Sequence, residues 1–343
     1  MAEANSERLH ALDAVRGFAL LAGIVFHATV SFLPAPAGVP LWIVMDSHRS
    51  LTLGVVFYGL HIFRMTTFFL IAGFFAHLMV ERRGVGGFVR DRIKRIAVPL
   101  LVGWPIVIAA IIAVSIWGAV VMAHGRPLPP APAYPGFPSF PLTHLWFLYL
   151  LLWLYAATLG LRAVVNAVDR SGAVGRMVDR TVSWIARNPL GALPLAAPAC
   201  AALYFTPKWM MWFGIPTPDS SLVPNLGAGV AFFVAFGFGW LVHRQSGLIE
   251  TLRGRWRLNL ALGLGLAVAG LAITGAAPML TPSQPGLAKL VFAACYALAS
   301  LRLTFAAIGL ALRFLSSFSP ARRYIADASY WLYIIHLPII LAL

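Results

Sequence analysis

The feature that most constrains this chain is a succession of apolar blocks, most of them about 20 residues long. An α-helix of that length crosses the ~30 Å hydrocarbon core of a bilayer. Only 11% of the residues are charged, whereas soluble globular proteins average about 25%. So little polar surface cannot coat a water-facing globule. The sequence therefore predicts an all-α fold, a polytopic transmembrane helical bundle.

The predicted spans are separated by gaps rich in charged residues, proline or glycine. They cover residues 12–33, 54–80, 96–123, 142–161, 189–206, 223–243, 258–276, 286–312 and 329–343. No separate soluble region is visible, so we expect a single membrane-embedded domain over residues 1–343. The last block is short and has no polar flank after it. We therefore expect about nine spans here and at least one more in the full-length protein.

The basic residues are distributed unevenly between the gaps. Most of the 26 Lys and Arg residues fall in alternate gaps on the side of the N-terminus, whereas the other side holds Arg49, Arg126 and Lys208. Cytoplasmic loops carry such an excess of positive charge. We therefore predict a multi-pass protein of the bacterial inner membrane, with a cytoplasmic N-terminus and a proline-rich outer loop at 124–141. The net charge of +15 reflects this topology, and we expect no nucleic-acid binding.

Ionisable residues inside a span are costly, so each of them is a candidate for function. The first span contains Arg16 and His27. Eleven residues are close to three helical turns, so both side chains project from one face, about 16 Å apart along the axis. Arg16 then lies near the cytoplasmic surface and His27 deep in the bilayer. In the alternative interpretation, Arg16 reaches the interface through its flexible stem and His27 is a packed core residue.

The second span contains a similar pair. His61 and Arg64 are three residues apart and so share a helix face. No acidic residue inside a span is an evident partner for Arg64, which predicts a bound anion or a water-filled cavity beside it. His144 begins the fourth span and His336 lies in the last one. Each of these two histidines either lines the entrance for an acceptor or makes one hydrogen bond at a helix end.

We expect no metal site. The histidines never reach the spacing of a tetrahedral set supported by cysteine or carboxylate. His77 and His243 fall at inner helix ends, where an interfacial position needs no further role. Cys200 and Cys295 lie inside apolar blocks and are most simply small hydrophobic residues.

Several motifs, in the same order along the chain, resemble those of the acyltransferase 3 family of membrane acyltransferases. Arg16 and His27 match the family's Arg-(ten residues)-His motif, which follows the stretch 8–17. Arg92 and Arg95 match its Arg-x-x-Arg motif. Three further stretches are similar to family signatures: 61–75, 143–148 and 328–338. Within the family, the sequence resembles the glucan biosynthesis protein C branch, a succinyltransferase type that acts on periplasmic glucans.

The resemblance implies a membrane O-acyltransferase that moves an acyl group, such as succinyl, from cytoplasmic acyl-CoA to a cell-envelope or periplasmic glycan. It gives His27 the role of catalytic base, which suits a side chain that titrates near neutral pH. The donor, acetyl-CoA or succinyl-CoA, is then a co-substrate, and no tightly bound cofactor is expected. The donor's phosphates need cations on the cytoplasmic side, which Arg16, Arg92 and Arg95 can supply.

The remaining candidates are assigned to the substrates, and they are His61, Arg64, His144 and His336. Topology alone would also explain the basic loop that contains Arg92 and Arg95. Two other classes of protein stay open at this point. A transporter or flippase could line an anion path with the same residues, although we find no internal repeat of the kind that many transporters show. A structural membrane subunit would leave His27 and Arg64 unexplained.

Overall fold

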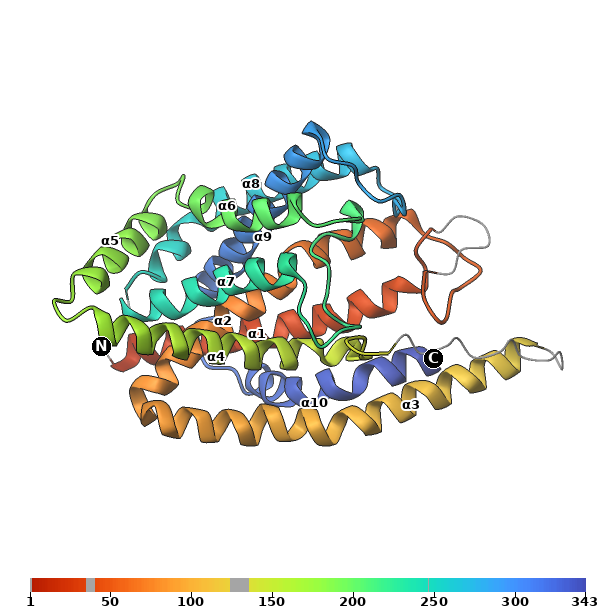
Figure 1. Cartoon of the computed structure of the whole chain (residues 1–343), viewed down its shortest axis with the longest axis horizontal. Helices are drawn as coiled ribbons and strands as arrows, with labels where there is room; N and C mark the ends of the chain where they lie inside the picture. The colour runs from red at the N-terminus through yellow and green to blue at the C-terminus, as the bar shows by residue number, and fades with distance from the viewer. Residues whose placement is uncertain (1, 35–40, 124–135, 246) are drawn as a thin grey trace.

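The computed structural model describes residues 2–34, 41–123, 136–245 and 247–343, with side chains from residue 10 onward. Helices make up most of these residues (Figure 1). They are α1 (Ala2–Val30), α2 (Leu51–Arg92), α3 (Val98–Ala123), α4 (Trp146–Val168), α5 (Ala173–Arg187), α6 (Ala192–Tyr204), α7 (Leu226–Arg244), α8 (Glu250–Thr274), α9 (Leu287–Phe314) and α10 (Pro320–Ala342). Three short turns complete the list: the π-helix η1 (Ile93–Ala97) and the 3-10 helices η2 (Thr143–Leu145) and η3 (Met211–Phe213).

The helices agree with the predicted bundle, with one correction of length. In the described part of the chain, 7 stretches are long and apolar enough to cross a membrane, and one of them, Leu51–Val121, contains α2 and most of α3. The predicted span 189–206 corresponds to α6, which has only 13 residues. A helix of that length is about 20 Å long and does not cross the hydrocarbon core by itself.

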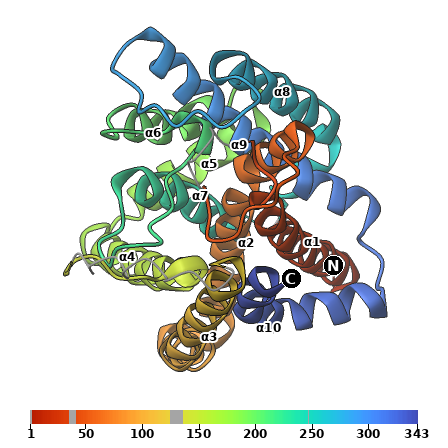
Figure 2. The ribbon, with the colours of Figure 1, turned by 90° about the vertical axis from the view of Figure 1, so that its right-hand side faces the viewer.

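Between α2 and α3 the chain reverses its direction (Figure 1). Gly84 interrupts α2 with φ 68° and ψ 174°, a backbone conformation that glycine adopts without steric cost. A last helical segment follows, and η1 then leads into α3. On either side of α2 lie two groups of helices, with α6, α8 and α9 on one side and α3 and α10 on the other (Figures 1 and 2).

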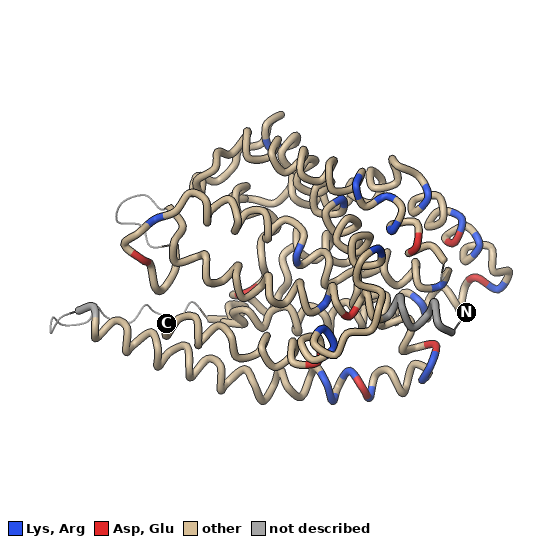
Figure 3. The backbone as a smooth tube through the Cα atoms, turned by 180° about the vertical axis from the view of Figure 1, so that it is seen from behind, with Lys and Arg blue, Asp and Glu red and all other residues tan. Residues whose placement is uncertain are grey.

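Lys and Arg residues gather at one end of the bundle, where α1 begins and where α2 turns into α3 (Figure 3). We call this the basic end and the opposite end the far end. The described chain thus has the charge asymmetry that the sequence indicated. The assignment of the basic end to the cytoplasm stays a prediction.

The sequence analysis did not predict α5, which lies between α4 and α6 at the basic end. Its apolar residues recur at helical spacing and pack inward through Val182 and Ile185. The polar face is tied to the end of α7, because Arg244 donates hydrogen bonds of 3.0 and 3.1 Å to the two carboxylate oxygens of Asp179. A hydropathy window misses such a helix because charged residues alternate with its apolar ones.

Part of the predicted outer loop 124–141 lies outside the described residues, which resume at residue 136. The part that is described is held at the far end. The backbone N–H of Phe140 donates to the carbonyl of Ser220 at 2.9 Å, and the indole N–H of Trp104 donates to the carbonyl of Pro141 at 2.9 Å. The end of the loop is therefore fixed against α3 and the α6–α7 connection.

The helices α2 and α7 cross with their backbones in contact. A Cβ atom placed on Gly73 would overlap the carbonyl oxygen of Phe236, and one placed on Gly239 would overlap the carbonyl oxygen of Leu70. Glycine is needed at both positions because backbone atoms cannot move aside as a flexible side chain can. This crossing fixes α7 against α2, and α2 lines the site described below.

We expect Gly73→Ala and Gly239→Ala each to destabilise the protein by about 1–3 kcal/mol, because the two helices must separate to admit the added methyl group. Gly237→Ala is the matched control, since a Cβ atom there meets nothing within 4 Å. Thermal unfolding of the purified protein in detergent measures the effect. Equal melting temperatures for all three variants would show that the crossing tolerates a wider spacing.

Candidate functional site

A cavity of about 1490 Å³ lies inside the bundle, with residues of α1, α2, α4 and α10 in its wall. At the basic end the wall includes Arg92, Lys94 and Arg95. At the far end it includes Lys208 and Asp219, from the connection between α6 and α7. One continuous cavity therefore extends from one end of the bundle to the other.

Every residue that the sequence analysis assigned to the site lies in the wall of this cavity. They are Arg16, His27, His61, Arg64, Arg92, Arg95, His144 and His336. Residues more than 300 positions apart in the sequence thus meet around one space. The roles assigned to them stay predictions, but the structure does bring all of them together.

His27 projects from α1 into the middle of the cavity. The centroid of its ring is 5.1 Å from that of His336 on α10 and 6.1 Å from that of Trp42. Phe26 meets the same ring edge-on at 5.0 Å. Within the described part of the chain neither ring nitrogen of His27 has a hydrogen-bonding partner, so both are available to a molecule in the cavity.

His144 and His336 lie next to each other in the cavity wall, with ring centroids 4.9 Å apart. Nε2 of His144 lies 3.1 Å from the carbonyl of Ile334, and the hydroxyl of Tyr333 donates to the carbonyl of His144 at 2.5 Å. Nδ1 of His336 lies 2.8 Å from the carbonyl of Tyr333 and therefore carries the proton. Its Nε2 is then an acceptor, and it has no partner among the described residues. Each histidine is held by a backbone carbonyl, and both line the cavity.

Arg64 is a buried cation in the cavity wall, 9% exposed. Its guanidinium carbon lies 4.5 Å from the centroid of the Phe26 ring, and Nη1 lies over Gly23, where a Cβ atom would be only 2.7 Å away. Among the described residues Arg64 has no ion pair, and its Nε has no hydrogen-bonding partner. The sequence offered no acidic partner for Arg64 inside a span, and the described residues supply none.

Two other buried cations of the described chain, in contrast, have hydrogen-bonding partners in the protein. Lys289 donates to the carbonyl of Thr206 at 2.9 Å, and Arg302 donates to the side-chain oxygen of Asn259 at 2.9 Å. Both therefore use their N–H groups on protein oxygens. Arg64 instead presents its N–H groups to the cavity, as a binding site for an anion would.

His61 lies one helical turn before Arg64 and shares its face, as the spacing predicted. Its ring stacks on Phe26 and Phe57, with centroids 5.1 and 5.7 Å away. The aromatic rings fix the orientation of His61 while the cavity stays open beside it. Phe26 therefore contacts His27, His61 and Arg64 and sets their relative positions.

Arg16 lines the cavity and also contacts two other groups. Nη1 makes a 3.2 Å ion pair with Asp13, and Nη2 donates to the carbonyl of Ala326 on α10 at 3.1 Å. Asp13 in turn lies 3.3 Å from Arg323 of α10. Arg16 is therefore partly neutralised and helps to join α1 to α10, which goes beyond the phosphate-binding role predicted for it.

Arg92 and Arg95 share an acidic partner that the sequence analysis did not single out. Asp91 is 9% exposed, and its oxygens lie 2.6 Å from Arg92, 3.1 Å from Arg95 and 3.4 Å from Arg83. Three guanidinium groups around one carboxylate leave positive charge unbalanced. The only signal in the sequence was an acidic residue within an otherwise basic run, and we interpreted that run as a topology signal. Asp91 holds these arginines in fixed positions at the basic end of the cavity.

The fold and the cavity define a class: a multi-pass helical membrane protein with a cavity inside its bundle that histidines and arginines line among apolar residues. Residues 9–343 match the model of the family described as acyltransferase domain. The chain therefore belongs to this family, Acyl_transf_3, and is a membrane acyltransferase.

The chain is also similar to curated proteins named "Glucans biosynthesis protein C". Those from Salmonella paratyphi B (strain ATCC BAA-1250 / SPB7) and Salmonella heidelberg (strain SL476) are each 23% identical over 313 residues, which cover 77% of this chain and 77% of each relative. No solved structure matches the chain. The resemblance noted in the sequence is confirmed at the level of the family.

Proposed function

We propose that this acyltransferase takes an acyl group from acyl-CoA at the basic end and transfers it to a hydroxyl of a cell-envelope glycan that enters from the far end. The continuous cavity carries this proposal, because both substrates must reach one reacting centre from opposite sides of a membrane. The names of the curated relatives mention glucan biosynthesis, which supports a glycan as acceptor. The transporter alternative would use the same cavity, but membership of an acyltransferase family favours the enzyme.

His27 is our proposed general base, because its ring faces the cavity with both nitrogens available. It removes the proton from the acceptor hydroxyl while that oxygen attacks the thioester carbonyl carbon. The tetrahedral intermediate collapses with cleavage of the C–S bond, and the imidazolium returns the proton to the departing CoA thiolate. The products are an ester and free CoA, so the base ends the cycle in its starting state.

The phosphates of the donor fit the basic end. Arg92, Lys94 and Arg95 line the cavity there, and Asp91 offsets only part of their charge. Arg16 stands between this cluster and His27 along the cavity wall. The pantetheine arm of CoA is extended, and its length is comparable to the ~16 Å that eleven helical residues span. A donor anchored by its phosphates can therefore place its thioester beside His27.

We propose that four further residues contact the substrates near the reacting groups: His61, Arg64, His144 and His336. Arg64 suits a donor with a free carboxylate, such as succinyl-CoA, because a guanidinium binds a carboxylate through two parallel hydrogen bonds. His336 offers an acceptor nitrogen at Nε2, which suits a sugar hydroxyl as donor of a hydrogen bond.

The proposal also places the basic end and the N-terminus in the cytoplasm of a bacterial cell, at the inner membrane. Single cysteines at Ser171 and Ser220, in a background without Cys200 and Cys295, test this orientation. Both serines are exposed, at the basic end and the far end respectively. A membrane-impermeant reagent added outside should label position 220 and not position 171. Labelling of position 171 and not of position 220 would show that the protein has the opposite orientation in the membrane.

The function itself is tested with purified protein in detergent, without any gradient. We expect release of free CoA thiol from succinyl-CoA or acetyl-CoA that depends on an added glucan, with the acyl mass appearing on the glycan in mass spectrometry. A transporter would release no thiol under these conditions. The same measurement on envelope glycans from cells with and without the gene identifies the natural acceptor.

A further inference from the structure

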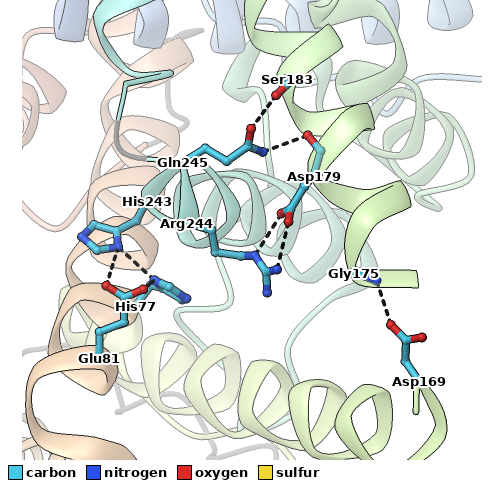
Figure 4. A network of polar contacts seen from close by, with 9 residues as sticks. All are labelled: His77, Glu81, Asp169, Gly175, Asp179, Ser183, His243, Arg244 and Gln245. Carbon is cyan, nitrogen blue, oxygen red and sulfur yellow. Dashed lines mark hydrogen bonds and ion pairs between the residues drawn. The ribbon is translucent and has the colours of Figure 1, made fainter. Parts of the chain in front are cut away.

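A second group of polar side chains lies at the basic end, outside the cavity. His77 and Glu81 project from α2 toward His243 of α7 (Figure 4). The wall of the cavity includes none of these three residues and uses another face of α2, which carries Leu78 and Arg82. The acyltransferase site therefore leaves this group unexplained.

The crossing of α2 and α7 explains why these side chains meet. His77 follows Gly73 by one helical turn, and His243 follows Gly239 by one turn. Because the two glycines bring the helix backbones into contact, the histidines one turn further on are forced together. Both are buried, with 8% of each residue exposed, rather than interfacial as we expected from the sequence.

Three potential ligand atoms converge on one point. Nδ1 of His77 lies 2.9 Å from Nδ1 of His243. One oxygen of Glu81 lies 3.4 Å from Nδ1 of His77, and its other oxygen lies 3.5 Å from Nδ1 of His243. All three ligand atoms lie within 4.8 Å of one another.

One hydrogen bond can join the two Nδ1 atoms, but it does not use the carboxylate of Glu81 beside them. If both Nδ1 atoms carried protons, two N–H groups would face each other at 2.9 Å. If only one carries a proton, the bare nitrogen and the carboxylate of Glu81 face each other as two acceptors. A divalent cation at the centre would use all three lone pairs at once.

We propose that His77, Glu81 and His243 bind a divalent transition-metal cation, most readily Zn²⁺, which joins α2 to α7. Two imidazoles and one carboxylate form a typical ligand set for zinc, with water in the fourth position. With Zn–N and Zn–O bonds of about 2.0–2.1 Å, tetrahedral ligands are separated by about 3.3 Å. The three distances in the structure lie close to this value. The sequence analysis expected no metal site because it considered only ligands at short sequence spacing. His77 and His243 lie 166 residues apart, so spacing could not bring them together.

Two arginines, Arg162 and Arg244, place positive charge near His77, and the carboxylate of Glu81 offsets part of it. Arg244 directly follows His243, but its guanidinium is directed away and is held by both oxygens of Asp179 (Figure 4). The Glu81 side chain is 54% exposed, so solvent can supply the fourth ligand and the metal can enter. The site would therefore exchange its metal with the solution at the basic end.

Metal binding to the purified full-length chain tests the proposal. After dialysis against Zn²⁺ and removal of excess metal, we expect elemental mass spectrometry to find one zinc ion per chain. The double variant His77→Ala/His243→Ala should retain less than a tenth of that. His48→Ala is the matched control, because it removes a histidine with a side chain 95% exposed, far from the cluster. Equal zinc contents in the wild-type protein and the double variant would overturn the proposal.

A second variant keeps the test decisive if the double variant does not fold. Glu81→Gln keeps the size of an exposed side chain, replaces one carboxylate oxygen by an NH2 group and removes the negative charge. We expect it to weaken Zn²⁺ binding at least tenfold. Zn²⁺ should also raise the melting temperature of the wild-type protein, and a chelator should reverse this, because a ligand that binds only the folded state stabilises it. No change of melting temperature with Zn²⁺, or equal affinity in Glu81→Gln, would show a purely hydrogen-bonded contact.

Discussion

Replacement of His27 by alanine is expected to reduce the rate of acyl transfer by about 10²–10⁴-fold, which is the usual contribution of a general base. The acceptor hydroxyl would then have to lose its proton to water, because the imidazole that faces the cavity at position 27 is gone. The rate of CoA thiol release at saturating donor and acceptor measures the loss. The affinity for acyl-CoA should change little, because the proposed phosphate contacts lie at the basic end, away from His27.

Two controls separate catalysis from packing. His27→Gln keeps a side chain of similar length against Phe26 and His336 but has no basic nitrogen, so it should be as inactive as the alanine variant. His48→Ala, in the connection before α2, should keep full activity. If either His27 variant retained more than a tenth of the wild-type rate while folded, His27 would not be the base. Loss of folded protein in both would support the alternative of a packed core histidine.

Arg64→Lys is expected to lower kcat/KM for succinyl-CoA by about 10–100-fold and to affect acetyl-CoA much less. A hydrogen bond to a charged group contributes about 1.5–3 kcal/mol, and an ammonium group cannot reproduce the paired geometry of a guanidinium. The acetyl group has no carboxylate, so acetyl-CoA does not make this contact and does not lose it in the variant. The ratio of kcat/KM values for the two donors is the measurement, because it cancels any general effect on folding or CoA binding.

Gly23 offers an independent perturbation of the same contact. A Cβ atom at position 23 would lie 2.7 Å from Nη1 of Arg64, so Gly23→Ala should push the guanidinium aside and keep its charge. We expect the donor ratio to shift in the same direction as in Arg64→Lys. Gly59→Ala is the control, since a Cβ atom there meets nothing within 4 Å. Equal losses for both donors in the Arg64 and Gly23 variants would assign Arg64 to CoA or to the fold.

Hydropathy predicted most of the helices because lipid imposes a simple rule: a spanning segment must be long and apolar. The rule says nothing about segments that do not span. It therefore missed α5, whose apolar residues cover one face only, and overestimated α6, where apolar residues continue beyond the 13-residue helix. Hydropathy did predict a reversal of the chain between residues 80 and 96, but not the kink at Gly84, because the sequence around a glycine does not reveal its dihedral angles.

The cavity residues could be selected from the sequence because a charged or polar group inside a span is costly wherever it lies. Arg64 and His27 were found in this way. Their partners could not be found, since Phe26, Gly23 and Tyr333 are ordinary residues whose importance comes from tertiary packing. The group of His77, Glu81 and His243 depends on a crossing between distant helices and was invisible for the same reason.

The ion pairs between α1 and α10 have a consequence for biosynthesis. Asp13 contacts Arg323, and the rings of His27 and His336 lie side by side, although each pair is separated by about 310 residues of chain. A ribosome delivers α1 to the membrane long before α10 exists. Nascent chains therefore hold His27 without its neighbour, and the reacting centre is completed only when α10 arrives. The proposed reacting centre is therefore absent from every chain whose synthesis has not reached α10.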